Sequence, residues 1–348
     1  MADTPTISVV MSIYNEEKYV ASAIQSILDQ TFRDFEFIII DDCSSDATPF
    51  ILAAFAQSDA RIRIIHNDYN LGLTRSLNIG LDCAQGEFIA RMDADDISLP
   101  MRLEKQLSVF SEQPNIVLCG TATVHIDEAG RRKSLGKWPD DLRIIKWYSV
   151  FRPALAHPSA MFRREVLNQG LRYDETLKTA QDYDLFSRMQ LYGDVTVLNS
   201  PLLLYRSHAN NISNKKSSEQ GKSAARICHD NLRRTFPAFF SKHGSQASVI
   251  IADFIHRETP LSSTEIATAV ETICGLETDY LQTLTPHDKL TMQAIQRLTV
   301  RWMVQAVFQK REVSLSIRLR LLYELRHRLL RLMEESLRYM SSKVKDRV

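Results

Sequence analysis

The sequence predicts an α/β fold with a mostly parallel sheet, followed by an α-helical C-terminal region. Two observations carry this prediction: short β-branched runs alternate with stretches of helical periodicity through the first hundred residues, and strand signals fade from about Ser217 onward. Strands that alternate with helices pair in parallel through right-handed crossovers. With 348 residues, 44% of them hydrophobic, the chain is long enough for two folded domains, which we expect at residues 1–214 and 215–348.

The expected elements follow one another regularly in the N-terminal part. They are strands at 7–14, 35–40, 61–65 and 87–92, and helices at 20–28, 46–57 and 74–84. Further along, we expect a helix at 101–110, a strand at 115–126, a helix that starts near Gln181, and two short strands at 195–198 and 202–205. In the C-terminal region, Ser262-Ser263-Thr264-Glu265 predicts a capped helix start.

Composition excludes some classes of protein. The 43 Lys and Arg residues balance 42 Asp and Glu residues, so we expect no nucleic-acid partner. The five cysteines are scattered and form no Cys-x-x-Cys pair, which argues against a disulfide framework or a zinc site and favours a reducing compartment. No run approaches the roughly 20 apolar residues that cross a bilayer. We therefore expect a cytoplasmic protein, either soluble or bound peripherally at the inner face of the plasma membrane.

Acidic side chains follow two of the predicted strands. Asp41 and Asp42 follow the strand at 35–40, and the motif Asp93-Ala94-Asp95-Asp96 follows the strand at 87–92. In parallel sheets, ligands collect outside the carboxyl ends of the strands, so these acids should meet the end of the first strand in one crevice. Oxygen ligands with full negative charge suit Mg²⁺ or Mn²⁺, and such an ion would hold a phosphate.

Two familiar phosphate-binding motifs are missing, and one alternative class fits poorly. No Gly-x-Gly-x-x-Gly follows the first strand and no Gly-x-x-x-x-Gly-Lys-Ser/Thr occurs in the chain, so phosphate handling falls to a metal or to basic side chains. Haloacid-dehalogenase phosphatases also place Asp-x-Asp after a strand, but they need Thr or Val next and use the first strand. Here Asp96 follows, and the motif ends the fourth strand.

Seven blocks of sequence occur in the order typical of one known family. They are SVVMSIYNEE (8–17), QTF and IIDDCSSD (30–46), NLG and NIG (70–80), DADD (93–96), HPSAMFRR (157–164), QDYDL (181–185) and YRSH (205–208). In these blocks the chain resembles the inverting glycosyltransferases of family 2, which have a Rossmann-like GT-A fold. The resemblance covers residue 6 to about residue 213, and the C-terminal part resembles no family that we can name.

The resemblance implies a nucleotide-sugar donor, usually a UDP-sugar, and a divalent metal, Mn²⁺ or Mg²⁺. It assigns roles to these positions: Ser12, Tyr14 and Glu17 near the uridine, Asp42 to the uracil, Arg75 near the nucleotide, Asp93 to the ribose or donor sugar and the metal, Asp95 as principal metal ligand, and His208 as a further metal ligand. Without the resemblance, Ser12 and Glu17 would be interpreted as turn or helix-start residues. His208 would be interpreted equally well as a loop histidine bonded to the backbone.

Asp182 falls at the position of the family's general base. An acceptor hydroxyl must lose its proton as it attacks, and a carboxylate aimed at that oxygen can take it. Relatives commonly have Glu before the base, whereas this chain has Gln181, and the loss of that charge should lower the pKa of Asp182. The alternative is that Asp182 is a plain helix cap. Asp184 lies two residues on and should point away from Asp182.

One base and one metal imply a single displacement with inversion at the anomeric carbon. We therefore expect a metal-dependent inverting glycosyltransferase that acts on a hydroxyl of a glycan or of a polyprenyl-linked saccharide. The alternative function is a catalytically silent module for nucleotide-sugar binding or scaffolding. Leucines and arginines at 318–340 predict an amphipathic helix that packs on its own domain, forms a homodimer, or contacts an anionic membrane.

Overall fold

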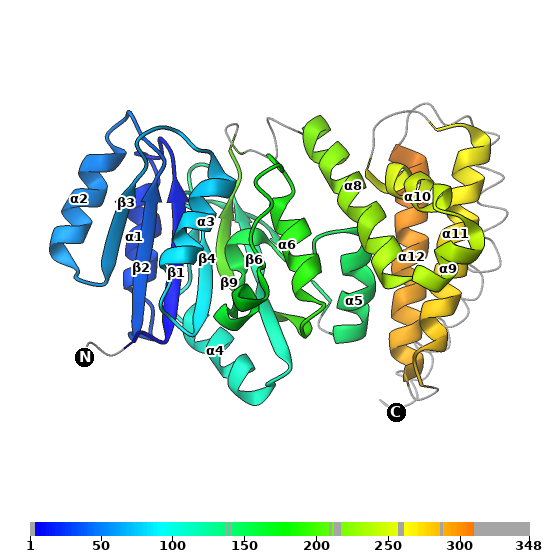
Figure 1. The fold of residues 1–348 in the computed structure, drawn as a ribbon. Helices are drawn as coiled ribbons and strands as arrows, with labels where there is room; N and C mark the ends of the chain where they lie inside the picture. The colour runs from blue at the N-terminus through cyan, green and yellow to red at the C-terminus, as the bar shows by residue number, and fades with distance from the viewer. Residues whose placement is uncertain are drawn as a thin grey trace. The chain divides into compact units, whose positions relative to one another are not determined.

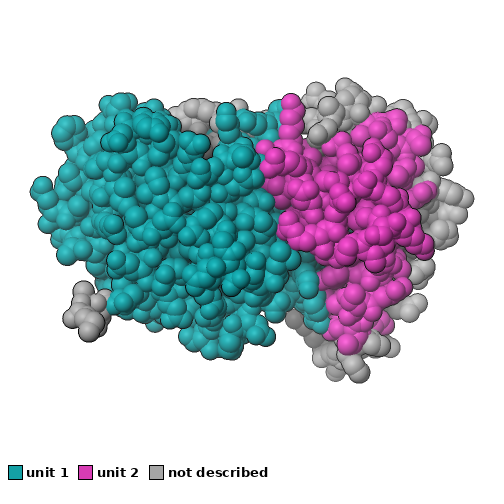
Figure 2. All heavy atoms as spheres, in the orientation of Figure 1, with its two compact units in different colours: residues 1–220 teal, residues 221–348 magenta. Residues whose placement is uncertain are grey.

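The computed structural model describes residues 4–136, 138–139, 141–208, 211, 217–256, 261–285 and 288–309. The chain divides into two compact units, Met1–Gln220 and Gly221–Val348, which Figure 2 shows in different colours. The domain boundary expected at residue 214 lies outside the described residues. The predicted α/β class holds for the first unit, and the second unit is helical (Figure 1).

The first unit is built on one mixed sheet. The described strands are β1 (Ile7–Ile13), β2 (Phe35–Asp41), β3 (Ile62–His66), β4 (Phe88–Met92), β5 (Ile97–Ser98), β6 (Ile116–Ile126), β7 (Arg132–Gly136), β8 (Met161–Arg163) and β9 (Asp194–Arg206). Their order is β3-β2-β1-β4-β8-β6-β9-β5, with β7 paired to β6. Strands β1 to β4 are parallel, and the short antiparallel strand β8 joins them to the parallel pair of β6 and β9.

Helices cover both faces of this sheet. They are α1 (Val20–Leu28), α2 (Thr48–Ser58), α3 (Leu73–Cys83), α4 (Arg102–Glu112), α5 (Leu142–Phe151) and α6 (Gln181–Met189), with short turns η1 (His157–Ser159) and η2 (Arg164–Gln169). Alternate residues of each strand face opposite sides, so Val9 and Met11 pack under α1, α2 and α4, whereas Val10 packs under α3, α5 and α6. Both faces of the central strands are buried, which explains their continuous apolar runs.

The expected order of strands and helices is confirmed, with one correction. The two short strands predicted at 195–198 and 202–205 form a single strand, β9. Pro201 lies between the two predicted strands; it lacks a backbone N–H and cannot donate to a sheet ladder. Instead of ending the strand, Pro201 faces Ala122 at an irregularity where the register between β6 and β9 shifts.

The second unit holds the C-terminal helices. They are α8 (Ser217–Thr235), which begins in the first unit, α9 (Pro237–His243), α10 (Gln246–His256), α11 (Ser263–Gln282) and α12 (Lys289–Gln309). The predicted capped start is confirmed: Ser262 Oγ accepts from the Glu265 N–H at 3.2 Å, and the Glu265 carboxylate accepts from the Ser262 N–H at 2.8 Å. Among the described helices, none has the length and apolar character needed to span a membrane. The amphipathic helix predicted at 318–340 lies outside the described residues.

Candidate active site

The carboxyl ends of β1, β2 and β4 lie at one edge of the sheet. The register pairs Ile13 of β1 with Asp41 of β2, and Met11 of β1 with Met92 of β4. The backbone N–H of Asp42 also donates to the Ile13 carbonyl at 2.9 Å. The residues that follow these three strands therefore lie at the same edge of the sheet, as the parallel topology predicts.

Asp42 is buried and bonded to the loop between β3 and α3. Its Oδ1 accepts from the Leu71 N–H and from Asn67 Nδ2, both at 2.8 Å, and its Oδ2 accepts from the Gly72 N–H at 2.8 Å. Gly72 has a φ of 85°, a left-handed conformation that glycine adopts without steric cost. The Asp42 carboxylate thus fixes the loop that starts α3 and carries Arg75 to this edge.

The end of β1 and the loop that follows it hold the other residues that the resemblance assigns to the nucleotide. Ser12 is buried, whereas Tyr14 is 49% exposed. Glu17 Oε2 accepts from the Ala47 N–H at 2.8 Å, directly before α2. Glu17 therefore bonds to the start of α2, a helix 30 residues further along the chain, and its role near the uridine stays a prediction.

Three residues other than glycine have a positive φ among those described: Asn15 (55°), Cys43 (62°) and Ala180 (58°). They follow β1, follow β2 and precede α6, respectively. The left-handed conformation costs about 1–2 kcal/mol for a residue with a Cβ. Such strain gathers at functional sites, where the surrounding structure holds it in place.

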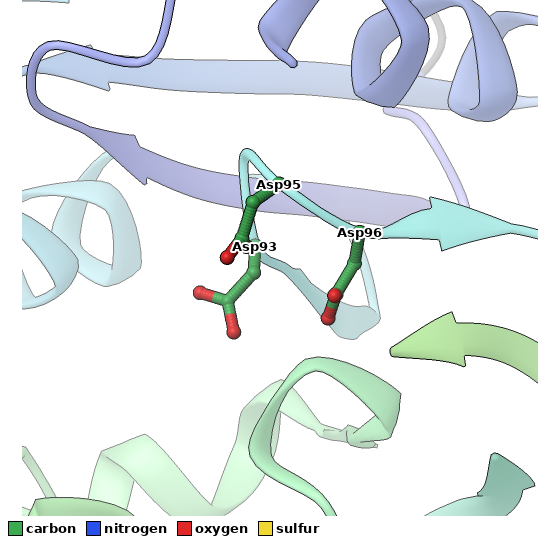
Figure 3. Close-up of side chains that lie close together, drawn as sticks. All are labelled: Asp93, Asp95 and Asp96. Atoms are coloured by element: carbon green, nitrogen blue, oxygen red, sulfur yellow. The ribbon is translucent and has the colours of Figure 1, made fainter. Parts of the chain in front are cut away.

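Three carboxylates gather on the turn between β4 and β5. One oxygen from each of Asp93, Asp95 and Asp96 lies within 4.8 Å of the others. Figure 3 shows the three side chains directed to the same side of the turn. Carboxylate oxygens at such spacing have the chemistry that Mg²⁺ and Mn²⁺ prefer.

Two residues that follow β9, His208 and Asn211, contact the Asp95 carboxylate. Its Oδ2 lies 2.8 Å from His208 Nε2 and accepts from Asn211 Nδ2 at 3.3 Å. Burial raises the pKa of Asp95, and Asp93 adds to this effect, while His208 acts in the opposite direction. His208 therefore lies beside the predicted metal ligand, as the prediction of a shared site requires. Asn211 was not predicted, because its contact with Asp95 spans 116 residues of sequence.

Asp96 faces inward and supports the same strand end. It is 1% exposed, its Oδ1 accepts from the Arg206 N–H at 2.7 Å, and its Oδ2 is buried without a hydrogen-bond partner among the described residues. The Arg206 guanidinium donates in turn to the Asp95 carbonyl at 2.8 Å and lies over the Tyr19 ring. Asp96 and Arg206 thus fix the turn that carries Asp93 and Asp95.

Asp182 is the second residue of α6. This helix begins at Gln181, directly after Ala180 with its positive φ. Burial raises the pKa of Asp182 above its ordinary value. The lowering expected relative to chains that carry Glu at position 181 stays a prediction. The Tyr183 backbone and the Arg91 guanidinium lower this pKa, whereas the charge of Asp93 raises it. Asp182 is therefore within electrostatic reach of the acid turn.

Asp184 is engaged elsewhere. Its Oδ2 accepts from Arg188 Nη2 at 2.6 Å, one turn further along α6. This agrees with the expectation that Asp184 points away from Asp182.

Contacts between α3 and the segment before α6 join the two sides of the site. Arg75 Nε lies 3.2 Å from Glu175 Oε2, and Asn78 Nδ2 donates to the Tyr173 carbonyl at 3.0 Å. Arg75 is thus placed by an ion pair at the same edge as Asp42, and its contact with a nucleotide stays a prediction.

Glu16 is a further acid that sequence reasoning missed. Burial, together with the charges of Asp95, Asp93 and Asp46, raises the pKa of Glu16 to about 7. Glu16 lies next to Glu17 in the first block of the family resemblance, and this position could have marked it as a candidate site residue.

Acids gathered at the carboxyl ends of the strands of an α/β sheet are typical of a ligand-binding site. Comparisons with known proteins identify the family. The model of glycosyl transferase family 2 matches residues 8–171. An uncharacterized glycosyltransferase of Haemophilus influenzae is 32% identical over 241 residues, which are 67% of this chain and 75% of that relative. The O-antigen biosynthesis glycosyltransferase WbnJ of Escherichia coli is 36% identical over 186 residues, 53% of this chain and 71% of the relative.

Solved structures share the fold at lower identity. TarS 1–349 from S. aureus, in complex with UDP-GlcNAc, has a TM-score of 0.58 at 16% identity, with 90% of each chain covered. The mannosyltransferase PcManGT from Pyrobaculum calidifontis, in complex with GDP-Man and Mn²⁺, has a TM-score of 0.51 at 15% identity, with 89% of each chain covered. The chain belongs to glycosyl transferase family 2 and has the predicted GT-A fold.

Proposed function

We propose that this glycosyltransferase is metal-dependent and inverting, and that it moves a sugar from a UDP-sugar to a hydroxyl group with Asp182 as the general base. One observation carries the proposal. Asp182 is a half-buried carboxylate at the start of α6, and the charge of Asp93 raises its pKa. A base and a set of metal-binding acids within mutual reach supply the two groups that a single displacement needs.

The acid turn fits a divalent cation. Asp93 and Asp95 would hold the ion with His208 beside them, since their oxygens lie within 4.8 Å and His208 Nε2 lies 2.8 Å from Asp95. The Oδ2 of Asp96, which is buried and has no hydrogen-bond partner among the described residues, lies in the same cluster. When bound, the ion would supply Lewis-acid stabilisation of the charge that develops on the leaving diphosphate. The Mn²⁺ present with PcManGT supports this choice by analogy.

The loops after β1 and β2 would receive the nucleotide. Asp42 Oδ2 accepts one hydrogen bond, so it keeps a lone pair for an N–H of a base. The exposed ring of Tyr14 offers a surface for stacking on that base. Ser12, Glu17 and Arg75 would line the same side. We favour UDP as the nucleotide, in line with TarS, which was solved with UDP-GlcNAc.

Asp182 would act on the acceptor. A carboxylate whose pKa is raised by burial is a stronger base than an exposed one, and it stays ionised at neutral pH as long as its pKa lies below that value. As the acceptor oxygen bonds to the anomeric carbon, its proton passes to Asp182 and the sugar–phosphate bond breaks. The attack comes from the face opposite the diphosphate, so the configuration inverts.

The acceptor would be a saccharide hydroxyl, free or on a polyprenyl-linked chain in the cytoplasm or at the inner membrane surface. The name of the relative WbnJ supports this class of acceptor, because it refers to O-antigen biosynthesis. Amylovoran biosynthesis glycosyltransferase AmsE of Erwinia amylovora, 30% identical over 204 residues, points to the same class.

The proposal is tested by incubating the full chain with a panel of UDP- and GDP-sugars and short saccharide acceptors. We expect release of the nucleoside diphosphate with Mn²⁺, and its loss when EDTA removes the metal. NMR of the product should show an inverted anomeric configuration. A retained configuration, or turnover that EDTA leaves unchanged, would contradict the proposed mechanism.

A further inference from the structure

Arg91 is a buried cation beside the acid turn. It lies on β4, two residues before Asp93, and is 2% exposed. Its Nη1 forms an ion pair with Asp93 Oδ1, while Nε and Nη2 are buried and have no hydrogen-bond partner among the described residues. Its neighbours Ala90 and Met92 belong to the core under α1 and α4, so the Arg91 side chain points to the opposite face, toward α3 and α6.

Burial of this guanidinium requires nearby negative charge. The effective penalty for burying an ion is several kcal/mol, and it is offset only by close, well-placed counter-charges. Asp93 supplies the ion pair, and Asp96 adds its field. Arg91 and the acid turn therefore depend on each other: Arg91 reduces the repulsion among three crowded carboxylates, and they make its burial possible.

The same charge acts on the other side of the site. Arg91 lowers the pKa of Asp182 against the effect of burial, and burial together with Arg91 keeps the pKa of His157 well below its ordinary value. Neutral His157 lies 2.8 Å from the Tyr173 hydroxyl and packs its ring against Phe186 of α6. The charges of Arg91 and Asp93 thus both act on Asp182, in opposite directions, and the charge of Asp182 raises the pKa of Tyr173.

We propose that Arg91 is a positioning residue of the transfer site, whose guanidinium holds the Asp93 carboxylate and couples the acid turn electrostatically to the base on α6. This inference rests on the proposed function, because it assigns Arg91 a part in that reaction. Arg91 contacts neither donor nor acceptor, since its nitrogens are fully buried. It acts through Asp93 and Asp182.

Arg102 offers a matched control. It is also fully buried, and it reaches β4 from the opposite face of the sheet. Its Nη2 donates to the carbonyls of Arg91 at 2.7 Å and Ala160 at 3.2 Å, and its Nε donates to Gln106 Oε1 at 3.0 Å. Arg102 thus satisfies backbone carbonyls where β4 separates from β8, and it forms no ion pair with the acids.

The test compares Arg91→Met, Arg91→Lys and Arg102→Met with the wild type, with Mn²⁺ present for turnover. We expect Arg91→Met to lower kcat by about 100-fold, because a misplaced reacting group costs about this much. The acidic limb of its pH–rate profile should move to higher pH, since the pKa of Asp182 loses the lowering effect of Arg91. Arg91→Lys keeps the positive charge, so its acidic limb should lie at the wild-type pH while its kcat stays below the wild-type value. Arg102→Met should lower stability and leave the acidic limb at the wild-type pH.

A readout without turnover separates this inference from the proposed function. The pKa of Asp182 can be followed by NMR of the ¹³C-labelled carboxyl group, assigned by its loss in Asp182→Asn. An upward shift in Arg91→Met supports the coupling even if no donor is turned over. An unmoved pKa of Asp182 in folded Arg91→Met would overturn the inference. If that variant fails to fold, a kcat of Arg91→Lys equal to that of the wild type would overturn it.

Discussion

The acids at the carboxyl edge of the sheet fall into two groups that differ in how their charge is satisfied. Asp42 accepts three hydrogen bonds from N–H groups of one loop. Asp95 and Asp96 lie close to other carboxylates, Asp182 is half-buried, and burial raises the pKa of each. The first kind of acid stabilises the loop that it organises, whereas the second kind holds charge at a cost in stability, which is typical of catalytic and metal-binding groups.

Among the variants that test this difference between the two groups of acids, Asp182→Asn should have the largest effect on the rate of transfer. Without a base, transfer should fall by about 10²–10⁴-fold. Because the folded pKa of Asp182 lies above its unfolded value, the ionised carboxylate lowers stability as pH rises through the interval between the two values. Asp182→Asn should therefore be more stable than the wild type at neutral pH, as measured by urea unfolding.

Asp184→Asn is the control for that measurement. It removes an ion pair with Arg188 one turn away on the same helix, so it should lose roughly 0.5 kcal/mol of stability and keep transfer activity. Transfer that persists in Asp182→Asn at the wild-type rate would remove Asp182 from the mechanism.

Asp42→Asn should show the opposite effect on stability. The NH2 of the amide would replace one carboxylate oxygen and would lie opposite the backbone N–H of either Leu71 or Gly72, so a loss of about 2 kcal/mol is expected. Thermal and urea unfolding would measure it. The exposed Asp68 lies in the same loop, and Asp68→Asn should change stability by less than about 0.5 kcal/mol. Equal stability of the two variants would show that Asp42 does not organise the loop.

The smallest effect is expected at Glu16. Because its pKa is raised to about 7, Glu16 loses its proton as pH rises through neutrality and adds a negative charge near Asp93 and Asp95. Mn²⁺ affinity should then rise between about pH 6 and about pH 8, and Glu16→Gln should reduce that rise. Calorimetric titration of Mn²⁺ would measure it, with Glu17→Gln as the control, since Glu17 is bonded to Ala47. An identical pH dependence in the two variants would argue against this role for Glu16.

Local patterns in the sequence predicted most of the first unit. Strand and helix periodicity depends on neighbouring residues, so β1 to β4 and the helices between them were predicted within a few residues. The parallel topology then brought Asp42 and Asp93 to the same edge without any knowledge of side-chain contacts.

Contacts between distant segments could not be predicted in this way. Arg91 lies in a run that is otherwise apolar, and its burial beside Asp93 depends on α3, α6 and η1 packing over β4. Asn211 and Arg206 reach Asp95 only because β9 pairs alongside β6 and β5. The raised pKa of Asp182 likewise arises from burial, which charge counting along the chain does not include.

The register shift opposite Pro201 limits how this strand can change in evolution. Side chains alternate between the two faces of a strand, so deletion of one residue there would turn Tyr205 and Arg206 to the wrong faces. It would also draw the strand end back by about 3.3 Å, away from Asp95 and Asp96. Related chains should therefore vary in length before Asp194 or after Asn211 more readily than between them.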